Sequence, residues 1–154
     1  MAKQHSYTIT IENNKSEKEA IDYLISMNSN FILPDKKSRK MLLDIFGIDQ
    51  KYIRAFDLIY ISGHSNIEDI IEFKSKDEVT FIELKTTKKK LTDLPKGFFF
   101  GATQSEFEIA ERLGEQYKFC FVSLHDESLG FELLTLKELS GIIRSKRIQY
   151  QINL

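Results

Sequence analysis

Two carboxylates and a lysine in the middle of the chain, Asp69, Glu83 and Lys85, have the types and spacing for metal-assisted chemistry. They lie in two apolar-rich runs, 69–74 and 79–87, which a short polar segment separates. This pattern predicts a β-hairpin. With the turn in the polar segment, Asp69 lies opposite Lys85, and the side chains of all three residues project from one face of the strands. A register shift of one residue would separate them.

Carboxylates held side by side repel each other, and a shared divalent cation relieves that repulsion. Hard oxygen ligands suit Mg²⁺, which takes few protein ligands and keeps several waters. Lys85 on the same face can orient or deprotonate a water, or stabilise negative charge on a phosphate. Together these groups predict metal-assisted phosphodiester hydrolysis. Two rival candidates lie nearby: Asp57, which begins an equally plausible strand, and the second Glu-x-Lys pattern formed by Glu72 and Lys74.

The elements that position these groups follow from apolar periodicity, capping boxes and turn residues. They are a strand at 7–12, a helix from the capping box at 16–19, a helix at 37–46, a strand at 56–62, the hairpin at 69–87, a helix from the capping box at 103–106, strands at 117–124 and 131–134, a helix at 135–143 and a strand at 147–154. This order predicts an α/β fold, a single domain with a mixed β-sheet flanked by helices.

Length and composition are those of one soluble globular domain, with 154 residues, 29% of them charged, and a formal net charge of −1. The charge excludes a strongly basic nucleic-acid binder and leaves local basic clusters, such as 36–40 and 88–90, to contact a polyanion. The single cysteine, Cys120, excludes an internal disulfide framework. Because no signal peptide and no apolar run of roughly 20 residues is present, we expect a soluble cytoplasmic protein without a membrane partner.

The run Glu68-Asp69, with Glu83-Leu-Lys85 and two threonines further on, resembles the motif of the PD-(D/E)XK nuclease superfamily. That superfamily includes many restriction endonucleases and the archaeal Holliday junction resolvases. Its restriction-endonuclease-like αβββαβ core matches the predicted order of helix, three strands, helix and strand. One departure is Glu68, which stands where the family usually has a proline. The resemblance implies one nuclease domain over residues 1–154.

The resemblance also implies roles for particular residues. Asp69 and Glu83 would be the metal ligands, and Lys85 the catalytic lysine. Many members add a glutamate from the first helix, which maps onto Glu19 as a further metal ligand, although the capping box also accounts for it. Many carry a glutamine early in the helix after the motif, and Gln104 stands there as a catalytic candidate. Free N–H groups at that helix start also favour a phosphate.

What the resemblance implies as a whole is a Mg²⁺-dependent endonuclease acting on double-stranded DNA, with Mn²⁺ as a substitute metal. The short chain has little room for a sequence-reading module. We therefore expect the cleavage domain or small catalytic subunit of a restriction endonuclease, acting as a homodimer or as a heterodimer with a recognition or cleavage subunit. The alternatives are a Holliday junction resolvase-like, structure-specific endonuclease and a non-catalytic DNA-binding or assembly module with the same fold.

Overall fold

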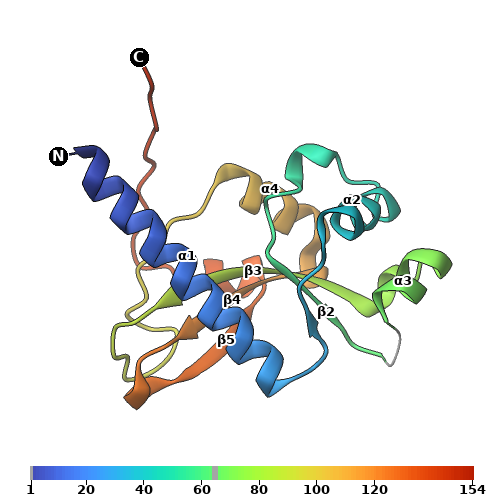
Figure 1. Ribbon diagram of the computed structural model, residues 1–154, viewed down its shortest axis with the longest axis horizontal. Coiled ribbons are helices and arrows are strands. Elements are labelled where there is room, and N and C mark those ends of the chain that lie inside the picture. The colour runs from blue at the N-terminus through green and yellow to red at the C-terminus, as the bar shows by residue number, and fades with distance from the viewer. Residues whose placement is uncertain (1, 64–65) are drawn as a thin grey trace.

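The computed structural model describes residues 2–63 and 66–154, with side chains described from residue 14 onward. Five strands form one sheet in the order β1–β2–β3–β4–β5 (Figure 1). They are β1 (Phe31–Ile32), β2 (Leu58–Ile61), β3 (Val79–Thr87), β4 (Tyr117–Ser123) and β5 (Gly130–Leu134). β3 pairs antiparallel with β2 and parallel with β4, so the sheet is mixed. With helices on both faces, this confirms the predicted α/β fold class.

The longer helices cover this sheet, and short 3₁₀ turns lie in the connections (Figure 1). The α-helices are α1 (Ala2–Met27), α2 (Lys36–Ile45), α3 (Ile67–Phe73), α4 (Gln104–Leu113) and α5 (Leu136–Ser140). The 3₁₀ turns are η1 (Gln50–Tyr52), η2 (Lys76–Glu78), η3 (Gly114–Gln116) and η4 (Asp126–Ser128). Within the described ranges, every helix is too short or too polar to cross a membrane.

Alternating side chains of the central strands build a separate core on each face of the sheet. On one face, α1 buries Ala20, Ile21 and Leu24, which helical spacing places on one side of the helix. Their strand partners include Leu58, Ile82, Leu84, Cys120 and Val122. On the opposite face, α2, α3, α4 and α5 pack on side chains that include Ile59, Phe81, Phe119 and Phe121. Glu83 and Lys85 alternate in register with Phe81 and therefore belong to this second face.

The predicted hairpin is wrong, because its first arm forms helix α3. The Asn66 side chain caps this helix by accepting a hydrogen bond from the Asp69 N–H at 2.8 Å. Ile70 is the residue that α3 buries, and Lys74 ends the helix with a φ of 52°. The antiparallel partner of β3 is β2, and β1 completes the meander. The αβββαβ order is therefore present as α1, β1, β2, β3, α4 and β4.

Two terminal predictions are also wrong. The strand expected at 7–12 and the helix start expected at Ser16 both lie within the single helix α1. β-Branched residues favour strands only weakly, so their presence at 7–12 does not prevent a helix. The strand expected at 147–154 has no helix or strand assignment, and its residues are exposed.

Candidate active site

Two carboxyl groups meet where β2 begins opposite the middle of β3. Leu58 pairs with Ile82, so the same antiparallel register, extended by one residue, places Asp57 opposite Glu83. The Asp57 N–H donates to the carbonyl oxygen of Ile82 at 2.8 Å. Its side-chain Oδ2 accepts from the Leu84 N–H at 2.7 Å. The Asp57 carboxylate thus completes the strand pairing with one oxygen while its side chain also contacts Glu83.

Among the acids of the site, Glu83 has the pKa that is raised most. Its side chain is buried, with 6% exposure, and its Oε2 is a buried oxygen without a hydrogen-bond partner. Burial raises the pKa of Glu83, and the hydrogen bond and negative charge of Asp57 raise it further, while Lys85 acts in the opposite direction. Two carboxyl groups hydrogen-bond to each other only when a proton lies between them. A divalent cation could take the place of that proton.

A third carboxyl group comes from α1. Glu17 is half-buried and lies on the same side of the helix as Ala20, Ile21 and Leu24, which dock α1 on the sheet. Burial raises the pKa of Glu17, and a hydrogen bond and the charge of Asp57 add to this effect. Glu17 therefore reaches the carboxyl group of Asp57, just before the start of β2.

These acids provide oxygen ligands suitable for a hard cation. Within the described side chains, no group of three or more His, Cys, Asp or Glu residues forms a ready metal site. Mg²⁺ does not require one, because it is commonly held by one or two carboxylates with water in its other positions. The unpartnered Oε2 of Glu83 and the adjacent carboxylate of Asp57 are oxygen ligands that fit such an ion.

Lys85 is held in place by the helix that follows the motif. Its Nζ donates to Glu106 Oε1 at 2.6 Å, and the two side chains are only 11% and 8% exposed. Glu106 Oε2 accepts from the N–H and the hydroxyl of Thr103, at 3.0 and 2.7 Å, in a capping box that starts α4. One carboxylate therefore both starts α4 and orients the lysine.

Arg39 supplies a second cation beside the carboxyl groups. From α2, its guanidinium donates to the carbonyl oxygens of Phe56 and Asp57, the latter at 3.3 Å. It also lies over the Phe56 ring, 4.5 Å from the centroid. Burial lowers the pKa of Arg39, and the charges of Asp57, Glu83 and Glu17 oppose that shift. Arg39 therefore fixes the backbone around Asp57 and partly compensates the negative charge of the site.

The structure brings together only part of the set expected from sequence. Glu83 and Lys85 lie side by side in alternation on β3. Asp69 lies instead in the first turn of α3, a helix in contact with α2. The carboxyl group that raises the pKa of Glu83 by a hydrogen bond and by its charge is Asp57. The carboxylate beside Glu83 is thus that of Asp57, the rival candidate. Two signals pointed this way: Asn66 is a helix cap, and isoleucines at 67, 70 and 71 have helical spacing.

The two supporting residues expected from the helices also differ. Glu19 is exposed on α1, and the residue that faces the site is Glu17. Counting back by helical spacing from Leu24 would have identified it. Gln104 is the exposed first residue of α4, whereas Glu106, two positions later, contacts Lys85. The capping box at 103–106 was the available signal, because its glutamate must turn back toward the helix start.

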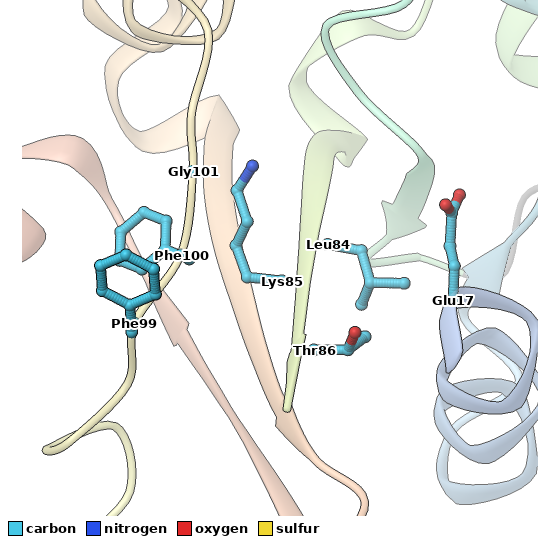
Figure 2. A pocket seen from close by; sticks show the side chains of 7 residues that line it. All are labelled: Glu17, Leu84, Lys85, Thr86, Phe99, Phe100 and Gly101. Atoms are coloured by element: carbon cyan, nitrogen blue, oxygen red, sulfur yellow. The ribbon is translucent and has the colours of Figure 1, made fainter. Parts of the chain in front are cut away.

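The site opens to solvent through two hollows that share Glu17. Figure 2 shows the first, in which the Lys85 side chain stands between two phenylalanines on one side and Glu17 on the other. Its lining comprises Glu17, Leu84, Lys85, Thr86, Phe99, Phe100 and Gly101. The second hollow is lined by Glu17, Leu33, Pro34, Arg39, Arg54, Phe56 and Asp57. An extended ligand could therefore cross the carboxyl cluster from the arginines to the phenylalanines.

Residues 62–133 match the protein-family model described as Protein NO VEIN, C-terminal. No curated protein and no solved structure matches the chain. The matching segment contains Glu83, Lys85 and Glu106, whereas Glu17 and Asp57 precede it. The similarity to the NO VEIN C-terminal region thus covers somewhat less than half of the chain, and it spans the β3 and α4 side of the candidate site.

Proposed function

We propose that this protein is a metal-dependent endonuclease that hydrolyses phosphodiester bonds in DNA. The observation that carries the proposal is the pair of Asp57, which is half-buried, and Glu83, which is buried and has an unpartnered carboxylate oxygen, on the same sheet face as the ion-paired Lys85. Asp57 and Glu83 would hold Mg²⁺, or Mn²⁺ as a substitute, and Glu17 would bind through a water or directly. Such an ion would activate a water and stabilise negative charge on a phosphoryl oxygen.

Lys85 supplies positive charge at the reacting phosphate. Because Glu106 holds its ammonium group in an ion pair, Lys85 acts as a donor and a fixed charge, and we assign it stabilisation of the negative charge that develops on the phosphate. Its limited exposure strengthens this interaction, since little water screens it. Glu106 is a positioning residue that acts through Lys85.

The likeness to the PD-(D/E)XK nucleases supports this proposal in a corrected form. The pattern is now carried by Asp57, which directly precedes β2, and by Glu83-Leu-Lys85 on β3, with Glu17 and Glu106 from the flanking helices. We further propose that the chain is the cleavage domain or small catalytic subunit of a restriction endonuclease. One such site cuts one strand, so cleavage of both strands of double-stranded DNA would need a second site in a homodimer or heterodimer.

Conservative variants test the proposal. The assay is Mg²⁺-dependent nicking of supercoiled plasmid, repeated with Mn²⁺ and with EDTA. Asp57→Asn keeps an oxygen that can accept from the Leu84 N–H, so it removes the charge and spares the strand pairing. We expect Asp57→Asn, Glu83→Gln and Lys85→Met each to lose roughly a hundredfold or more of the nicking rate.

The matched control is Asp69→Asn, which changes the carboxylate that α3 carries away from the β2–β3 pairing. We expect it to nick at the wild-type rate. Metal-dependent nicking that survives in both Asp57→Asn and Glu83→Gln would refute the proposed site. A wild-type chain that binds Mg²⁺ but cuts no DNA, alone or with its genomic partner proteins, would favour the non-catalytic alternative.

A further inference from the structure

We infer that Phe99 stacks on an unpaired base of the DNA, so that the strand being cut is single-stranded or locally unpaired beside the scissile phosphate. This inference rests on the proposed function and specifies its substrate. The starting observation is that the Phe99 side chain is 97% exposed. A phenylalanine in this position contributes no free energy of burial to folding.

Phe99 is kept in solvent by its two neighbours. Phe98 and Phe100 are half-buried, and their rings pack edge-on against Phe121, with centroids 5.1 and 5.0 Å away. They also contact each other at 6.3 Å. Anchors on both sides of Phe99 tie this segment to the sheet. Its ring therefore cannot turn into the core without displacing at least one neighbour.

The exposed ring lies beside the groups proposed to act on phosphate. Phe99 and Lys85 line the same hollow, and Figure 2 shows the rings of Phe99 and Phe100 on one side of the lysine side chain. The Phe100 ring centroid is 5.9 Å from Lys85 Nζ. Only one sugar separates a phosphate from its base. A nucleotide with its phosphate at Lys85 therefore carries its base within reach of the Phe99 ring.

Exposed lysines follow Thr86, which lines the same hollow as Phe99, and they favour a nucleic-acid strand over an apolar occupant. Lys88 and Lys89 are exposed directly after β3, and the Lys89 N–H donates to Thr87 Oγ1 at 3.2 Å, which fixes where the chain leaves the strand. An aromatic platform next to a basic segment is the arrangement that binds single strands, where the ring stacks on a base and the lysines follow the phosphates. Bases inside a duplex offer no free face, so the base at Phe99 must be unpaired.

The binding test uses the full chain with Glu83→Gln to prevent cleavage. Fluorescent oligonucleotides carry 2-aminopurine, whose emission falls when an aromatic ring stacks on it, in single-stranded and in fully paired form. We expect Phe99→Ala to weaken single-strand binding by roughly five- to hundredfold and to abolish the emission change, while duplex binding stays the same. Phe99→Trp should retain both signals.

Phe99→Leu is the matched control, since it keeps an apolar side chain of similar size but has no ring to stack. We expect it to behave like Phe99→Ala. Binding by Phe99→Leu that equals the wild type would overturn base stacking. Because Phe99 is exposed, all three variants should unfold at the wild-type temperature, and a lower temperature for Phe99→Ala would contradict its placement outside the core.

Cleavage separates this inference from the proposed function. With Glu83 intact, gapped or mismatched DNA should be cut faster than paired DNA, and Phe99→Ala should erase that preference. A chain that nicks paired and unpaired DNA equally, with no effect of Phe99→Ala, overturns the inference and leaves the nuclease proposal standing. A chain that cuts nothing but binds single strands through Phe99 refutes the nuclease and supports the stacking site.

Discussion

Replacing Glu83 by glutamine should stabilise the protein, increasingly so as the pH rises. Burial and the adjacent Asp57 raise the pKa of Glu83, so the folded protein holds this proton more tightly than the unfolded chain does. The stability that the protonated group contributes is complete below the pKa of an unfolded glutamate, about 4.3, and is lost as the pH rises toward the folded pKa. Glutamine has no proton to lose and avoids this loss.

The size of the effect follows from counting protons. A folded state that binds one more proton than the unfolded state loses about 1.4 kcal/mol of unfolding free energy per pH unit. Between pH 5.5 and 7.5, the advantage of Glu83→Gln over the wild type should therefore grow by up to about 2.7 kcal/mol. Solvent screening does not diminish this, because the Glu83 side chain is only 6% exposed.

The assay is urea unfolding at pH 5.5, 6.5 and 7.5 without divalent cations. Glu72→Gln, which neutralises an exposed glutamate on α3, is the control and should track the wild type at each pH. Parallel pH dependences for the wild type and Glu83→Gln would refute the reasoning, because they would mean that Glu83 titrates like a solvated carboxylate.

Three further outcomes are expected. By calorimetry, Mg²⁺ should raise the unfolding temperature of the wild type more at pH 8 than at pH 6, because it displaces the proton of Glu83. Mg²⁺ should not raise the unfolding temperature of Glu83→Gln in this way. Glu106→Gln should lower kcat by roughly 10- to 100-fold with KM little changed, since it releases Lys85 without touching DNA; an unchanged kcat in steady-state nicking would contradict that positioning role. Tyr117→Phe removes the hydroxyl that donates to the carbonyl oxygen of Ala55 inside the core. It should cost about 1–3 kcal/mol in urea unfolding, and full stability would mean that water replaces the bond.

The sequence predicts the β3 part of the site well, because that part depends on local order. Glu83 and Lys85 share a face through strand alternation alone, and the apolar run around them marks a buried strand. The capping boxes at 103–106 and 135–138 likewise form as their spacing predicts. In each case the interacting residues are near neighbours in the chain.

Asp57 could not be chosen in the same way, because its contact with Glu83 spans the whole of α3. Closing a hairpin next to Glu83 is the simplest local solution, and it selects Asp69. The true register pairs β2 with β3 across an inserted helix, and that depends on burying Ile70 against α2 and on pairing Leu58 with Ile82. The side of α1 that faces the sheet, by contrast, follows from the helical spacing of Ala20, Ile21 and Leu24.

Asp57 and Glu106 have structural roles besides those in the proposed activity, and this affects how related chains would change if that activity were lost. Asp57 ties β2 to β3 through the Leu84 N–H, and Glu106 starts α4 through Thr103. A descendant freed from selection for catalysis would still benefit from a hydrogen-bond acceptor at both positions. Glu83, whose ionisation opposes folding, would drift first, toward glutamine or an apolar residue. Under the proposed function, an intact aspartate in a relative therefore says little about activity, and the residue at position 83 is the more informative one.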